Sequence, residues 1–186
     1  FHNPKGVRSD NIEQAIKYFQ AALQVYTRSA FPEEWAMAKG NLSVAYTERN
    51  EGSKAENLEK AISIIEDLLE VTQRKTSPGE WASLQLSLGN ALSKRIHGLK
   101  AENIEQAIYH YQLAEKIYTY DTFPADWGML QINLGIAYRN RVKGERTENL
   151  QKAIDHYRAA LEVNTRKTHP ERWATIQMNL ASVYAD

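Results

Sequence analysis

Tryptophan recurs along this 186-residue chain with one unvarying step of 46 residues. Proline, glycine, asparagine and alanine repeat with the same step, and no insertion or deletion interrupts four rounds. This regularity predicts similar units that cannot bury their apolar faces alone and therefore stack into one solenoid. The defining positions are Trp35, Trp81, Trp127 and Trp173; Pro32, Pro78, Pro124 and Pro170; Gly6, Gly52, Gly98 and Gly144; Asn11, Asn57, Asn103 and Asn149; and Ala15, Ala61, Ala107 and Ala153.

Each unit is predicted to be a hairpin of two helices, which we call the first and the second helix. The first helix starts at the proline, as at Pro124, because proline at the first helical position loses no hydrogen bond. We expect it to end near Val142, before Gly144. The second helix is predicted to open at Asn149 as its N-cap and to carry apolar residues at steps of three and four. No sustained alternation of apolar and polar residues supports a strand.

The expected fold is therefore all-α, with about eight helices in a single solenoid over residues 1–186. Its predicted parts are a second helix at 11–28, hairpins at 32–75, 78–121 and 124–167, and a terminal first helix at 170–186. Both ends should expose apolar helix surface, so self-association through the terminal helices is expected. The chain begins with Phe1 rather than methionine, and we expect it to be part of a longer protein.

The repeat resembles the tetratricopeptide repeat family. The resemblance rests on Leu134-Gly135 with Tyr138 in a first helix, and on Ala153, Tyr157 and Ala160 in the second helix that follows. The family's usual period is about 34 residues, so the helices here should be longer. The amino-acid sequence of the repeat is similar to that of long arrays in bacterial, especially cyanobacterial, multidomain proteins with caspase-like or signalling domains. The resemblance implies a right-handed superhelix whose first helices line a concave face, and protein–protein interaction as the function.

The composition excludes several classes of protein. Lys+Arg and Asp+Glu balance at 23 each, which disfavours nucleic acid as a partner because phosphate binding needs a basic surplus. The absence of cysteine removes disulfides, thiolate zinc sites and cysteine nucleophiles. No apolar run is long enough to cross a membrane, and no signal peptide is visible, so a cytoplasmic protein is expected.

Two recurring side chains allow a structural and a functional interpretation. The tryptophans are expected to be buried between helices, the alternative being ligand stacking. The arginines, one near the end of each complete first helix, are expected to pair with a nearby glutamate or the helix C-terminus; a cationic ladder for an acidic partner is the alternative. Glutamates such as Glu13, Glu59 and Glu105 are expected to be solvated on exposed faces. The arginines are Arg49, Arg95 and Arg141.

A stripe on the first helices, opposite the core direction set by Leu42, is the predicted partner-binding surface. It is small, rich in amides and poor in charge, so it could hydrogen-bond a partner's backbone, while its methionines adapt to shape. The alternative is that its asparagines hold adjacent helices in register. We call this set the inner stripe: Met37, Asn41, Val44 and Glu48; Ser83, Ser87, Asn90 and Lys94; Met129, Asn133, Ile136 and Asn140; Thr175 and Asn179.

No catalytic, cofactor or metal site is expected. His110 and His156 lie one repeat apart, roughly 10 Å by helix packing distance, and no histidine pair or glycine loop matches a known site motif. The sequence therefore predicts a scaffold that binds a peptide or a partner domain on its concave face. A structural spacer or self-association element is the alternative, and small-ligand capture is less favoured because the inner stripe has no aromatic residue.

Overall fold

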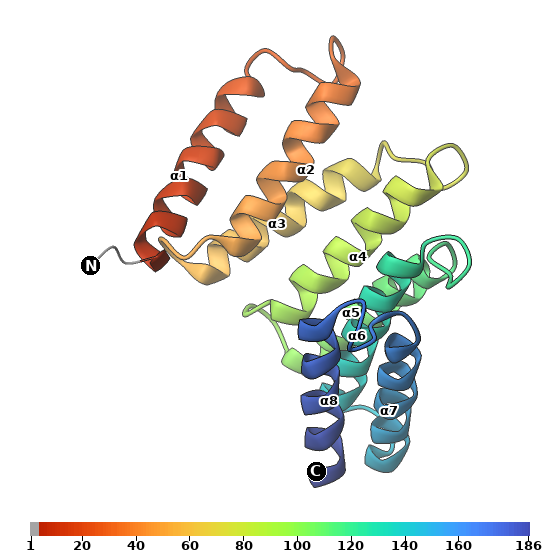
Figure 1. Ribbon diagram of the computed structural model, residues 1–186. Coiled ribbons are helices and arrows are strands. Elements are labelled where there is room, and N and C mark those ends of the chain that lie inside the picture. Colours follow the sequence, from red (N-terminus) through yellow and green to blue (C-terminus); the bar gives the residue numbers. More distant parts are fainter. Residues whose placement is uncertain (1–3) are drawn as a thin grey trace.

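The computed structural model describes residues 4–186 and is all-helical over that range (Figure 1). Consecutive helices run antiparallel and pack as neighbours along the chain, as in a helical repeat solenoid. The expected all-α repeat fold is confirmed. The helices are α1 (Pro4–Ala22), α2 (Pro32–Glu48), α3 (Lys54–Leu69), α4 (Pro78–Lys94), α5 (Lys100–Glu115), α6 (Pro124–Asn140), α7 (Arg146–Val163) and α8 (Pro170–Ala185).

The first helices α2, α4, α6 and α8 begin at the four periodic prolines, as predicted. Helix α8 ends at Ala185, one residue before its predicted end. Helix α6 ends at Asn140, two residues before the predicted Val142, and the extended residue Arg141 leads into a loop. The glycine of that loop, Gly144, has φ +80° and supplies a left-handed turn that other residues rarely adopt. It therefore shapes the loop, not the helix end.

The predicted asparagine N-caps are wrong. Helix α7 begins at Arg146 with Glu145 as N-cap residue, so Asn149 lies within its first turns. The Asn149 side chain is buried and its Nδ2 donates to the carbonyl of Lys143, 2.8 Å away. Asn57 and Asn103 bind their loops in the same way. The periodic asparagine thus holds the loop between the two helices of a hairpin, which a local capping pattern does not reveal.

The predicted second helix at 11–28 also differs from the structure. Helix α1 starts earlier, at Pro4, and ends at Ala22. Just beyond Ala22 two backbone hydrogen bonds have three-residue spacing, since Gln24 N–H donates to the Ala21 carbonyl and Val25 N–H to that of Ala22. The predicted helix end at 28 is therefore six residues too late.

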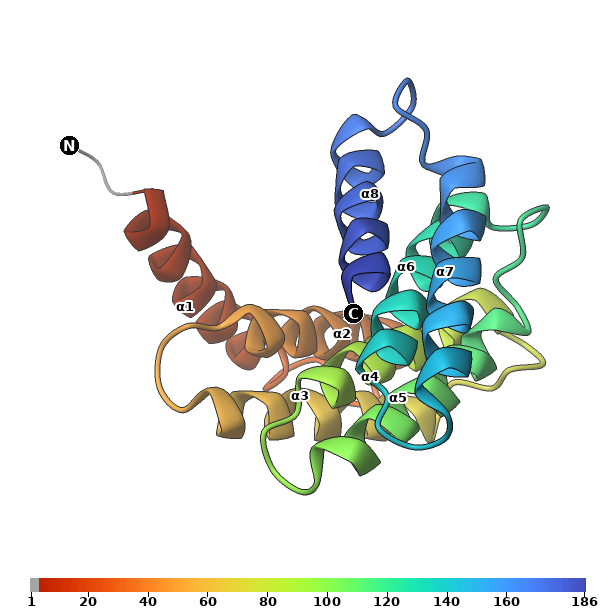
Figure 2. The same cartoon turned by 90° about the horizontal axis from the view of Figure 1, so that it is seen from below.

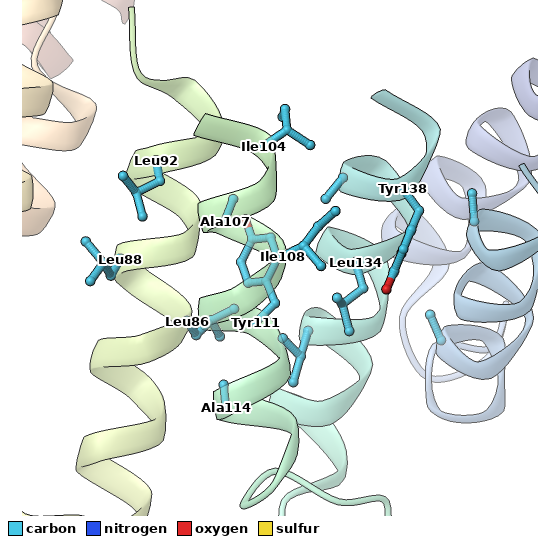
Figure 3. Packing of buried hydrophobic residues seen from close by; sticks show 14 of the residues in the cluster. Leu86, Leu88, Leu92, Ile104, Ala107, Ile108, Tyr111, Ala114, Leu134 and Tyr138 are labelled. Carbon is cyan, nitrogen blue, oxygen red and sulfur yellow. The ribbon is translucent and has the colours of Figure 1, made fainter. Parts of the chain in front are cut away.

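The core is a row of layers between stacked helices. One buried cluster joins α1, α2 and α3, and a larger one runs from α3 to α8. Figure 3 shows Ile108 and Tyr111 of α5 placed between α4 and α6, with Leu134 and Tyr138 on the α6 side. The helices within a hairpin pack more extensively than helices of adjacent hairpins. No helix in the described range is long and apolar enough to cross a bilayer.

Candidate functional site

The first helices lie on the inner side of the curved array. Within residues 4–186, helix α6 contacts α4 and α8, whereas the second helices make no comparable contacts with one another. Figure 2 shows α2, α4, α6 and α8 facing the opening between the two ends of the array, with α3, α5 and α7 behind them. A side chain on the exposed face of a first helix therefore points towards the hollow of the array.

None of the fourteen inner-stripe residues is buried. The apolar members are most exposed on α2, which carries the N-terminal part of the stripe: Met37 is 64% and Val44 57% exposed. The corresponding residues Met129 and Ile136 of α6 are 38% and 39% exposed. The stripe is therefore a solvent-accessible surface whose apolar side chains are less exposed in α6 than in α2.

Two adjoining hollows lie at the N-terminal end of this surface. The smaller one, about 290 Å³, combines Asn41 and Val44 of α2 with Ile12 and Phe19 of α1. Sequence reasoning missed this contribution of α1, because it considered only first helices. The larger one is a cleft of about 660 Å³ at the C-terminal ends of α2 and α4, and Glu48 belongs to both hollows. The remaining residues of the two hollows are Arg8, Ala45, Thr47, Asn50, Lys54 and Lys94.

The middle of the stripe is held together by internal hydrogen bonds. Asn133 Nδ2 of α6 and the Tyr111 hydroxyl of α5 both donate to Asn90 Oδ1 of α4, each over 2.9 Å. Burial raises the pKa of Tyr111 to about 12, so the hydroxyl keeps its proton as a donor. For Asn90 and Asn133 these bonds favour the structural alternative, in which the amides hold adjacent helices in register.

The tryptophans are only half-buried, although Trp35 and Trp127 pack against the core clusters. The turn before each later first helix places a side chain on the indole ring. Arg74 lies 5.4 Å from the Trp81 centroid and Arg166 5.9 Å from that of Trp173, while Tyr120 contacts Trp127 edge to face. These contacts assign the tryptophans to the joint between repeats.

The periodic arginines pair with glutamates, as one interpretation predicted. Arg95 at the end of α4 makes a two-pronged ion pair with Glu59 of α3, over 2.7 and 2.8 Å. Arg49 pairs with Glu13 and Arg141 with Glu105 in the same geometry. The expectation that these glutamates are solvated on exposed faces is wrong, because each side chain is paired with an arginine and only 25–33% exposed.

These ion pairs join the second helices α1, α3 and α5 to the end of the first helix that follows each of them. Hydrogen bonds from the arginines lower the pKa of Glu13, Glu59 and Glu105 below its usual value. Arg49 and Arg141 also donate to the loop asparagine of their own repeat. The arginines are committed to the array and do not form a free cationic ladder.

Each of the two periodic histidines bridges the two helices of its own hairpin. His110 Nδ1 lies 2.6 Å from Gln85 Oε1, and His156 Nδ1 lies 2.6 Å from Gln131 Oε1. Desolvation lowers the pKa of both histidines. Among the described residues, no group of three histidine or carboxylate side chains could hold a metal ion.

Together these features define a helical repeat solenoid whose inner face carries an accessible stripe and two hollows. Compared with family models, with curated proteins and with solved structures, the chain matches none. The class therefore rests on the period of the sequence and the packing of the helices.

Proposed function

We propose that this chain is a protein-binding scaffold of the tetratricopeptide type, which holds a peptide or a partner domain against the inner stripe. The observation that carries the proposal is the hollow beside Val44. It joins apolar groups of α1 and α2 to the amide of Asn41, and Asn41 is exposed. A peptide could bury an apolar side chain there and hydrogen-bond its backbone to the amide.

The internal hydrogen bonds of Asn90 and Asn133 leave the N-terminal part of the stripe as the better binding surface. Their amides are shared between helices, so a partner gains little from them without breaking the array. The N-terminal part of the stripe, with Met37, Asn41 and Val44, is open to a partner. We therefore centre the interaction on α2 and on the face of α1 that lines the same hollow.

A displayed library of random peptides, selected on the 186-residue chain, tests this proposal. Selected peptides should lose about tenfold or more in affinity for a Val44→Glu variant, because the charge would have to be desolvated in an apolar contact. Tyr109→Glu is a matched control, since Tyr109 is 58% exposed on the second helix α5. Circular dichroism should show unchanged helicity for both variants.

Two outcomes would contradict the proposal. If the selected peptides bind Val44→Glu as tightly as the original chain, the inner face is not the site. If repeated selections enrich no peptide, peptide binding is wrong, and the spacer alternative becomes the better account.

A further inference from the structure

A cation recurs at one fixed place in every repeat, at the first residue of α3, α5 and α7 and within the first turns of α1. The four residues are Arg8, Lys54, Lys100 and Arg146. Lys54 Nζ donates to the carbonyls of Thr47, at 2.5 Å, and Arg49, at 3.4 Å. Arg146 donates to the carbonyl of Arg139. Lys54 and Arg146 therefore sit at the C-terminal ends of first helices, where carbonyls lack intrahelical partners.

The residue 40 positions after each cation is the last inner-stripe residue of a first helix or, in α8, the equivalent position 186. At the two ends of the array this residue is acidic and pairs with the cation, Glu48 with Arg8 and Asp186 with Arg146, each at 3.1 Å. In the middle the same position holds Lys94 and Asn140. Lys54, which would pair with a carboxylate at position 94, instead shares the larger cleft with Lys94.

The cleft therefore holds a local positive surplus in a chain whose net charge is zero. Three cations and one carboxylate line it, and that carboxylate, Glu48, is already paired with Arg8. Lys54 and Lys94 are both exposed, and within residues 8–186 neither has an acidic partner within 4.0 Å. Thr47 and Asn50 add a hydroxyl and an amide.

We propose that the cleft between Lys54 and Lys94 binds the carboxylates of an acidic segment in a protein partner. The proposal deepens the function proposed above and rests on it, since it names the chemistry of the partner at one end of the inner stripe. The array itself shows how a carboxylate occupies such a position. Asp186 Oδ2 accepts from Arg139 Nε at 2.8 Å and from Arg146 Nη2 at 3.1 Å.

The surroundings favour a protein over a nucleic acid. The cleft adjoins the hollow formed by Ile12, Phe19 and Val44, and both hollows include Glu48. Apolar side chains suit a peptide with mixed acidic and apolar residues, whereas a phosphate backbone needs a long basic track. The acidic residues Glu48 and Asp186 interrupt any such track along the helix ends.

The test is fluorescence anisotropy with a labelled oligoglutamate peptide, an oligoglutamine peptide of the same length and oligothymidylate, at low and at physiological salt. Oligoglutamate should bind more tightly than oligoglutamine, and salt should weaken the difference. Lys94→Glu should weaken oligoglutamate binding about tenfold, because the new carboxylate would pair with Lys54 as Glu48 pairs with Arg8. Lys167→Glu, in the turn before α8, changes the net charge equally and should leave binding unchanged.

Three results would overturn the proposal: equal binding of the two peptides, equal effects of Lys94→Glu and Lys167→Glu, or tighter binding of oligothymidylate than of oligoglutamate. The same measurements distinguish failure of this acidic-segment proposal from failure of the proposed scaffold function. Library-selected peptides that respond to Val44→Glu but not to Lys94→Glu would keep the inner stripe as the site and remove only the acidic specificity.

Discussion

Replacing Gly135 with alanine tests how closely the two helices of a hairpin pack. Gly135 lies in α6 opposite Tyr157 of α7, whose side chain is 1% exposed. A Cβ atom at position 135 would lie 2.5 Å from Tyr157 Cε1 and 2.7 Å from Cδ1. Carbon atoms in contact normally stay about 3.5–4.0 Å apart, so the ring or the helices must move by about 1 Å. The buried ring has little room to do so.

Two opposing effects set the magnitude. Alanine favours a helix interior over glycine by about 0.8–1 kcal/mol, and overpacking a close-packed core costs about 1–3 kcal/mol. We expect the steric effect to win, with a net loss of about 1–2 kcal/mol. Gly40 of α2 provides the matched control, because nothing lies within 4 Å of its Cβ position. Gly40→Ala should therefore stabilise the array by about 1 kcal/mol.

Thermal unfolding followed by circular dichroism distinguishes the two variants. For a chain of this size 1 kcal/mol corresponds to roughly 2–4 °C. Gly135→Ala should melt roughly 2–8 °C below the original chain, and Gly40→Ala roughly 2–4 °C above it. If both variants stabilise equally, the close approach of α6 to the Tyr157 ring is refuted.

Three further predictions concern polar contacts inside the array. Glu105→Gln, which copies Gln151 at the equivalent position, should lower the free energy of unfolding by about 1 kcal/mol, because it removes the ion pair to Arg141. Asp67→Asn, at an exposed ion pair, should lower it by under about 0.5 kcal/mol. Equal denaturation midpoints for the two variants would contradict this. His110 and His156 have a pKa below the usual 6.5, so their contribution to stability is complete above about pH 6.5 and is lost as pH falls through the folded-state pKa. The double variant His110→Gln with His156→Gln should therefore show a flatter melting temperature in that window. It should keep the separate loss that begins as pH falls below the ordinary glutamate value of 4.5, because ion pairing lowers the pKa of the three paired glutamates and stabilises the fold only while they are ionised. Asn133→Leu should lower the melting temperature by disrupting the bond to Asn90, while Asn41→Leu should not, and the opposite order would refute the register role.

The sequence predicted the helical hairpins and their proline starts because both follow from local properties. Apolar spacing reports the buried side of a helix, and proline at the first helical position depends only on its own missing N–H. Asn149 was misassigned because asparagine near the start of a helix is also the pattern of an N-cap. Its actual partner, the carbonyl of Lys143, lies in the preceding loop.

The ion pairs and the cleft depend on contacts between repeats. Glu13, Glu59 and Glu105 stand 36 residues before their arginines, a constant spacing that could have revealed the pairing. The cleft was harder to predict, because Lys54 and Lys94 are far apart in the sequence and line one cleft only once the helices are stacked. The contribution of α1 to the smaller hollow likewise required the angle between α1 and α2.

The most direct test of the binding surface uses the three native methionines. Met37 and Met129 lie on the inner stripe, whereas Met178 is 73% exposed on α8 outside it. Methyl spectra of the chain labelled at methionine should be recorded while a library-selected peptide is added. The account predicts that the Met37 resonance shifts most, that Met129 follows if the partner extends along the stripe, and that Met178 stays unchanged. Saturable binding that shifts only Met178, or none of the three, would contradict it.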